Sequence, residues 1–278
     1  MNYIVTAVDH RAWDSMLVPF IGSLRERGKW DQPLIVLDYG LSSVQREILH
    51  LHDIRIEAPL GVQTIYLDRF SSIARLAKRD GGTYYLYDAD IWFAHPITDL
   101  MGWAKPGQLG FALDAWASEF LLHCLNEGAE NVQTLHQLIR HSKQKDGQVP
   151  QAGLTVGDAE SFGCLDRVQR ILLEKGCCRD FYGTDTLSLL MYRYLFEEKS
   201  YIVPKTFNAV PNLSELAQKE PGPFFLDDQL VRALHCTRPF RKTEKFTFAH
   251  HFPREYAKWQ SELSPREMGV AQSGSVKF

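Results

Sequence analysis

The stretch YYLYDAD, residues 84–90, points to both the fold class and the site. Its first four residues are aromatic or aliphatic, a composition typical of a buried β-strand. Asp88 and Asp90 follow immediately, where the backbone leaves the predicted strand. In a parallel sheet that end of a strand borders the ligand crevice, and carboxylates at i and i+2 can both reach one cation there. A solvated turn is the alternative interpretation, but the buried character of residues 84–87 argues against it.

The rest of the chain alternates between strand and helix patterns. Short apolar runs predict strands over residues 3–8, 33–38, 54–57, 83–87, 109–113 and 152–156. Helical spacing or a capping residue predicts helices over residues 13–24, 42–51, 68–79, 158–173 and 184–196. Strands that alternate with helices favour a parallel sheet with helices on both faces. We therefore predict an α/β fold with a mixed, mainly parallel sheet flanked by helices.

The domain organisation is predicted from the same pattern. We expect one domain over residues 1–264, with a nucleotide-binding half at about 1–115 and an acceptor-side half at about 116–264. Frequent prolines predict irregular, loop-rich packing in its last part. Residues 265–278 are predicted to be a disordered tail.

Composition excludes several function classes. The net charge of −3 gives no basic field for nucleic acid, and no apolar run is long enough to span a bilayer. The N-terminus lacks a signal-peptide pattern, and the five cysteines contain no Cys-x-x-Cys pair. We expect a cytoplasmic protein, with the inner face of the membrane as an alternative place of action. Residues 254–259 could touch a membrane-borne acceptor or form a plain amphipathic helix, and we favour the plain helix.

Several segments together resemble one family. The run YLYDADIWF, residues 85–93, resembles the Asp-x-Asp element of GT-A glycosyltransferases, and the wider pattern is similar to the glycogenin and bacterial lipooligosaccharide galactosyltransferase family. Five further segments match in order: VTAVD at 5–9, VLDYGLS at 36–42, ARL at 74–76, QAGL at 151–154 and GTD at 183–185. The resemblance covers roughly residues 3 to 260. It implies a GT-A, Rossmann-like fold.

The resemblance also implies an activity. A sugar would pass from a nucleotide-diphosphate donor, expected to be a UDP-sugar, to a glycan or lipid-linked acceptor in bacterial polysaccharide or lipopolysaccharide synthesis, with retention at the anomeric carbon. Mn²⁺ or Mg²⁺ would be held by Asp88, Asp90 and a histidine. The matched motifs place donor contacts at Ala7, Asp9, His10, Arg75, Asp88 and Ala89, and catalytic groups at Asp185 and Gln151. Gln151 replaces the family's asparagine and residues 184–186 replace its Asp-Gln-Asp, so the sugar and the stereochemistry stay open.

Two histidines compete for the third metal position. His235 precedes a stretch whose Arg238 and Lys242 can bind phosphate, in place of the family's Gly-x-x-Lys-Pro-Trp loop. His250 follows a β-like run at 246–249. We favour His235 because positive charge follows it.

Simpler roles exist for several of these residues. Asp9 can merely cap a helix. Asp185 can serve as nucleophile, as charge stabiliser or only as the start of a helix. Asp114, at the end of a predicted strand, is a further candidate for the donor or acceptor pocket.

Three different functions compete with glycosyl transfer. A nucleotidyltransferase acting on sugar phosphates would share the sheet and the carboxylates, but usually has a Gly-rich loop after its first strand, which is missing here. A degenerate, non-catalytic sugar-nucleotide-binding domain would not need the intact Asp88 and Asp90. A zinc hydrolase would need histidines at ligand spacing beside the carboxylates, and the sequence has no such pair.

Overall fold

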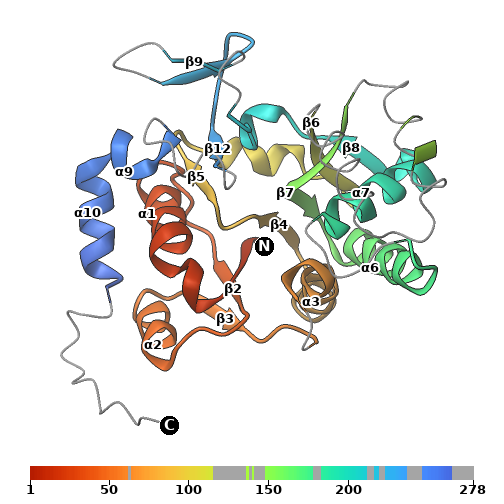
Figure 1. Cartoon of the computed structure of the whole chain (residues 1–278), viewed down its shortest axis with the longest axis horizontal. Coiled ribbons are helices and arrows are strands. Elements are labelled where there is room, and N and C mark those ends of the chain that lie inside the picture. The colour runs from red at the N-terminus through yellow and green to blue at the C-terminus, as the bar shows by residue number, and fades with distance from the viewer. Residues whose placement is uncertain are drawn as a thin grey trace.

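The central sheet is mixed and mainly parallel. The computed structural model describes residues 1–61, 64–114, 136–137, 140, 148–177, 183–211, 216–218, 223–236 and 246–264. Within these residues, seven strands form one sheet in the order β3-β2-β1-β4-β7-β6-β8 (Figure 1). The strands are β1 Asn2–Val8, β2 Leu34–Asp38, β3 Arg55–Glu57, β4 Thr83–Tyr87, β6 Leu109–Asp114, β7 Val149–Gly157 and β8 Ser200–Ile202. Strands β3, β2, β1 and β4 are parallel, whereas β7 runs antiparallel between β4 and β6. The predicted fold class is confirmed.

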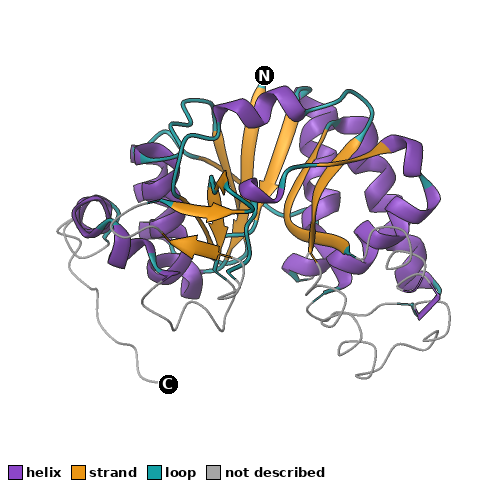
Figure 2. Cartoon of the chain, turned by 90° about the horizontal axis from the view of Figure 1, so that it is seen from above, coloured by secondary structure: helices purple, strands orange, loops and turns teal. Residues whose placement is uncertain are grey.

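Helices cover both faces of this sheet. The main ones are α1 Val18–Glu26, α2 Ser43–Leu51, α3 Ile65–Asp80, α6 Ala159–Glu174, α7 Thr184–Leu195, α9 Phe248–His251 and α10 Pro253–Glu262. Figure 2 shows helices on either side of the strands. Alternate residues of β4 separate the two cores: Tyr84 and Leu86 pack with α3 and α6, and Tyr85 and Tyr87 pack with α1 and α2. Alternate side chains of a strand point to opposite faces of the sheet, and both faces are buried here. All four residues at 84–87 are therefore aromatic or aliphatic.

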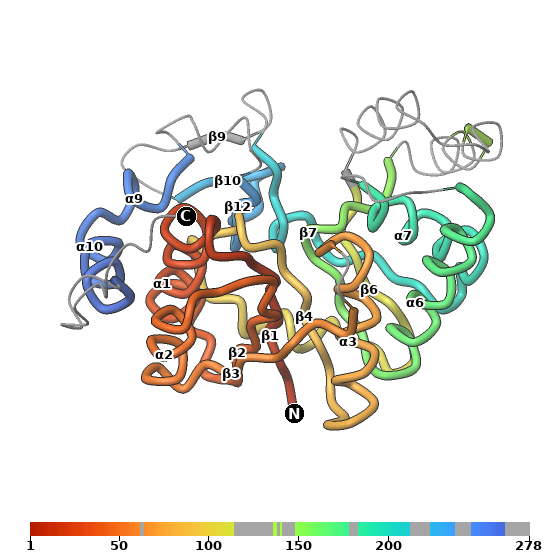
Figure 3. The backbone as a smooth tube through the Cα atoms, turned by 60° about the horizontal axis from the view of Figure 1, so that its bottom comes forward, coloured from red at the N-terminus to blue at the C-terminus, as the bar shows by residue number. Residues whose placement is uncertain are grey.

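Short strands join the C-terminal part to the segment that follows Asp88 and Asp90. β5 Ile91–Phe93 pairs antiparallel with β12 Ala233–His235, and Ala209 bridges to Leu234. A separate small sheet consists of β9 Leu216–Gln218, β10 Phe224–Leu226 and β11 Gln229–Leu230. Its strand β10 packs near β12 (Figure 3). The pairing of β12 with β5 brings residues far apart in sequence to the end of β4.

Local boundaries differ from the predictions at three places. The first helical segment begins as a π-helical turn, η2 Trp13–Leu17, before α1. Gly183, at φ +114°, is the N-cap of α7, so Thr184 is its first helical residue and not its cap. The β-like interpretation of residues 246–249 is wrong, because Thr247 caps α9 by accepting a hydrogen bond from the backbone N–H of His250. Local capping overrides β-propensity there.

The C-terminal helix α10 packs against α1. Lys258 and the Trp259 indole both contact Glu26, Arg27 pairs with Glu255, and Trp13 donates to the backbone oxygen of Leu263. Among the described residues, no helix is both long and apolar enough to cross a bilayer. The predicted division near residue 115 falls at the edge of the described range 64–114, and the predicted tail 265–278 lies outside the described residues.

Candidate metal centre

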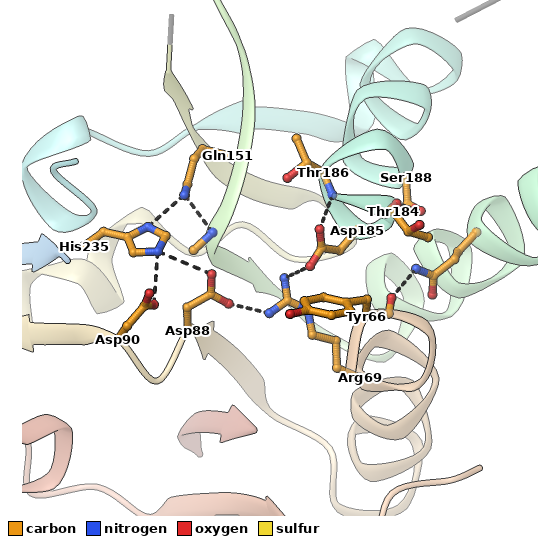
Figure 4. Close-up of polar contacts among 12 residues, drawn as sticks. Tyr66, Arg69, Asp88, Asp90, Gln151, Thr184, Asp185, Thr186, Ser188 and His235 are labelled. Atoms are coloured by element: carbon orange, nitrogen blue, oxygen red, sulfur yellow. Dashed lines mark hydrogen bonds and ion pairs between the residues drawn. The ribbon is translucent and has the colours of Figure 1, made fainter. Parts of the chain in front are cut away.

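Asp88 and Asp90 lie in the turn between β4 and β5. The backbone N–H of Asp88 donates to Gly153 O of β7 at 3.0 Å, and Cys236 N donates to Asp90 O at 2.9 Å. Two different neighbours of the turn, β7 and the end of β12, therefore fix its backbone. Both carboxylates consequently point to one place beside the carboxyl end of β4 (Figure 4).

His235 completes the group. It pairs with Ile91 across the β12–β5 ladder, and its Nε2 lies 3.2 Å from Asp90 Oδ1 and 3.6 Å from Asp88 Oδ2. One ligand atom from each of the three residues lies within 4.8 Å of the other two. Two carboxylates and one imidazole suit a divalent ion such as Mn²⁺, and carboxylates suit Mg²⁺. This donor set fits the expected cation.

His250 takes no part in this group. It lies in α9, and the neighbouring His251 ring stacks on Trp92 with centroids 5.7 Å apart. Among the described residues, the candidate metal ligands are Asp88, Asp90 and His235. Of the two histidines considered from the sequence, His235 is the one that lies beside the two aspartates.

Gln151 turns toward His235. Its Nε2 lies 2.7 Å from His235 Nδ1, while its Oε1 accepts from Gly153 N at 2.7 Å and from the amide of Asn208. Asn208 is buried. The sequence did not indicate a role for Asn208, because a single asparagine outside any motif carries no distinctive signal.

Arg69 bridges Asp88 and Asp185. Its two terminal nitrogens each contact one carboxylate, from α3 to the end of β4 and to the first turn of α7 (Figure 4). Arg69 is only 3% exposed. Burial alone would lower the pKa of Arg69, but the charges of Asp185 and Asp88 outweigh burial and raise that pKa above its usual value. The guanidinium therefore stays protonated.

The family motif in the sequence indicated Arg75 and not Arg69 as the donor-contacting arginine. The Arg75 side chain donates to the backbone oxygen of Ala58 at 2.5 Å. Six residues along a helix turn the side chain by roughly 240°, so the two arginines point in different directions. Arg69 had no motif to mark it, although its helical register with the apolar residues Ile73 and Leu76 was an available signal.

Asp88 lies among several charges. Burial raises the pKa of its carboxyl group, Arg69 and His235 oppose that shift, and Asp90 and Asp185 add to it. The net direction is upward. Arg69 brings one positive charge to a group of three carboxylates, and a divalent cation would offset the remaining negative charge.

Asp185 is buried at the N-terminal end of α7. Its Oδ1 accepts from Thr186 N at 2.6 Å, and its Oδ2 contacts Arg69. Both oxygens therefore have partners.

The Tyr66 side chain lies beside Arg69 (Figure 4). Burial, followed by the charges of Asp185 and Asp88, raises the pKa of Tyr66.

The other predicted donor contacts lie in several separate segments of the chain. Asp9 caps the short helix η1 His10–Ala12 by accepting from Arg11 N and Ala12 N, so the capping alternative describes the structure. His10 is exposed. Ala7 lies within β1, and Ala89 is buried between the two aspartates. Arg238, Lys242 and the side chain of Asp114 lie outside the part of the chain that the structure describes.

Comparison with known proteins identifies the fold. No protein-family profile and no curated protein sequence matches the chain. Among solved structures, the galactosyltransferase LgtC in complex with donor and acceptor sugar analogs superposes with a TM-score of 0.53 at 14% identity, covering 95% of each chain. The protein described here has the GT-A fold.

Two further structures share this GT-A fold. The bifunctional glycosyltransferase WbbM matches with a TM-score of 0.55 at 14% identity, over 95% of this chain and 51% of its own. Mouse xyloside xylosyltransferase 1 matches with a TM-score of 0.53 at 12% identity, over 86% and 99% of the two chains. These likenesses are of fold, and in this GT-A chain the Asp88, Asp90 and His235 group lies at the carboxyl end of β4, next to β1.

Proposed function

We propose that this protein is a divalent-metal-dependent glycosyltransferase that moves a sugar from a nucleotide-diphosphate donor to a glycan or lipid-linked acceptor. The observation that carries the proposal is the convergence of Asp88, Asp90 and His235 in a GT-A fold. Their ligand atoms are close enough to share one cation, and they lie at the sheet edge where α/β folds bind ligands.

The proposed reaction exchanges one bond at the anomeric carbon for another. The bond to the diphosphate oxygen breaks, the acceptor hydroxyl oxygen bonds to that carbon and releases its proton, and the nucleoside diphosphate leaves with the electron pair. Bound Mn²⁺ or Mg²⁺ would stabilise the charge on the leaving diphosphate. Asp88, Asp90 and His235 would hold that ion, and Arg69 would keep Asp88 in place.

The donor nucleoside would bind along the end of β1. Ala7, Asp9 and His10 lie there, beside β4 in the parallel sheet. We assign the nucleotide to the half before residue 115, the acceptor to the half after it, and the diphosphate to the stretch with Arg238 and Lys242. UDP is the proposed nucleotide, and a bacterial surface glycan is the proposed product.

Asp185 would act as a charge stabiliser. Both of its oxygens have partners, a backbone N–H and the Arg69 guanidinium, which suits a fixed charge better than a nucleophile. We propose retention at the anomeric carbon, as the family resemblance implies. The anomeric configuration of the first-formed product, followed by NMR, tests it.

The decisive experiment is thermal stability with UDP-, GDP-, CMP- and dTDP-linked sugars, each with and without Mn²⁺. A ligand that binds only the native state raises the melting temperature. We expect one nucleotide class to give a shift that needs Mn²⁺. Asp90→Asn should lose that shift, whereas the matched surface variant Glu174→Gln should keep it. No shift in the wild type with any donor would contradict the proposal.

A further inference from the structure

The imidazole of His235 is held from its far side. Its Nε2 faces the two aspartates, and Gln151 Nε2 lies 2.7 Å from its Nδ1. A β-carbon at position 153 would lie 2.4 Å from Nδ1 and 2.5 Å from Cε1, so only glycine leaves room for the ring. The ring is therefore confined by β7 on the side opposite the aspartates.

Gln151 is itself fixed in position. Its Oε1 accepts from the backbone N–H of Gly153 at 2.7 Å and from the amide of Asn208, which is only 4% exposed. Asn208 precedes Ala209, whose oxygen accepts from the backbone N–H of His235. Asn208, Gln151 and the His235 ring thus form one chain of contacts anchored in two strands.

We infer that Gln151, supported by Asn208, is a positioning residue that turns Nε2 of His235 toward the cation. This inference rests on the proposed metal site. It gives Gln151 a role through His235 and not at the anomeric carbon, because its amide is directed at the ring. Partners of this kind on the second nitrogen of a metal-bound histidine fix its tautomer and its orientation.

The proton on the ring decides which variant can replace Gln151. When Nε2 binds a cation, the remaining ring proton is on Nδ1, so the atom opposite must accept a hydrogen bond. Reversal of the Gln151 amide would offer Oε1 to Nδ1, and Asn208 could reverse with it, but the backbone N–H of Gly153 would then lose its acceptor. A glutamate at this position would accept from Nδ1, from Gly153 N and from Asn208 together without any reversal.

The test measures the binding of Mn²⁺ alone to the full chain. The EPR signal of the free ion reports how much Mn²⁺ remains unbound. Gln151→Leu should weaken binding by about 10- to 100-fold, and Gln151→Glu should bind at least as tightly as the wild type. Melting temperatures without metal show that each variant is folded. A role for Gln151 in the fold alone would lower the metal-free melting temperature of Gln151→Leu along with its Mn²⁺ affinity.

Asn208→Ala places the second amide in the same chain of contacts. It should weaken Mn²⁺ binding in the wild type and add nothing in the Gln151→Leu background. Two results would overturn the inference and leave the proposed function standing. In the first, the wild type binds Mn²⁺ and Gln151→Leu binds it equally well. In the second, Gln151→Glu and Gln151→Leu lose the same amount of Mn²⁺ affinity. If the wild type binds no Mn²⁺, the metal site fails and this inference fails with it.

Discussion

Nε2 of His235 lies 3.2 Å from Oδ1 of Asp90, across the pairing of β12 with β5. These two residues come from distant parts of the chain, and the ladder between Ile91 and His235 fixes their approach. The candidate metal centre thus depends on one short antiparallel pairing between the turn after β4 and the C-terminal part.

The two aspartates should differ in what they contribute to stability. Asp90→Asn is expected to lower Mn²⁺ affinity by more than about 100-fold with little change in the metal-free melting temperature, because Arg69 pairs with Asp88 and Asp185 instead. Asp88→Asn should lose metal binding and also about 1–3 kcal/mol of unfolding free energy, since Arg69 loses a charged partner. Titration with Mn²⁺ and urea unfolding measure the two effects. Equal stability losses would contradict this distinction.

Removal of Arg69 should destabilise the fold strongly. Arg69→Met leaves the Asp185 carboxylate buried without its counter-charge, at a cost of about 3–5 kcal/mol in urea unfolding. Arg75→Met is the matched control, and we expect it to cost about 1 kcal/mol, because the Arg75 side chain donates to a backbone oxygen, that of Ala58, and not to a buried carboxylate. If Arg75→Met lost as much unfolding free energy as Arg69→Met, the special role given to the Arg69 ion pairs would be wrong.

A methyl group at position 153 should disturb His235. Gly153→Ala would place its β-carbon 2.4 Å from Nδ1, so the ring must shift, and we expect about 1–3 kcal/mol of destabilisation together with weaker Mn²⁺ binding. Gly163→Ala is the control, since among the described residues no atom other than those of its own helix backbone and chain neighbours lies within 4 Å of a β-carbon there. That variant should be neutral or gain up to about 1 kcal/mol. The idea fails if both variants bind Mn²⁺ as the wild type does.

Docking of α10 should weaken in acid. The hydrogen bond from Lys258 lowers the pKa of Glu26, burial opposes that shift, and the Trp259 indole adds to it. Because the folded pKa lies below the usual 4.5, this stabilisation is complete above pH 4.5 and is lost as the pH falls through the folded value. Hydrogen exchange of α10 amides should therefore accelerate at low pH relative to the rest of the molecule.

Glu26→Gln provides the control for α10. The variant cannot ionise at this position, so the acid-dependent difference between α10 and the other helices should shrink. If the wild type and Glu26→Gln show the same pH profile, the Glu26 carboxylate does not control the docking of α10.

The alternation of strands and helices could be predicted from local pattern. Ser42 and Gln45 form the capping box that begins α2, and the apolar run at 84–87 forms β4, as expected. Such features depend on neighbours within a few residues, which the sequence displays directly. Asp88 and Asp90 were found for the same reason, because they follow a buried strand.

Only the tertiary structure decided which partners those aspartates meet. Arg69 and Arg75 lie on one helix, and the direction of each side chain depends on how α3 packs against the sheet. Gln151 reaches His235 because β7 and β12 lie on either side of the turn at Asp88. The sequence by itself determined the strand, the turn and the carboxylates, whereas long-range pairing and helix packing, which no local spacing encodes, determined the arginine, the orientation of the amide and the approach of His235.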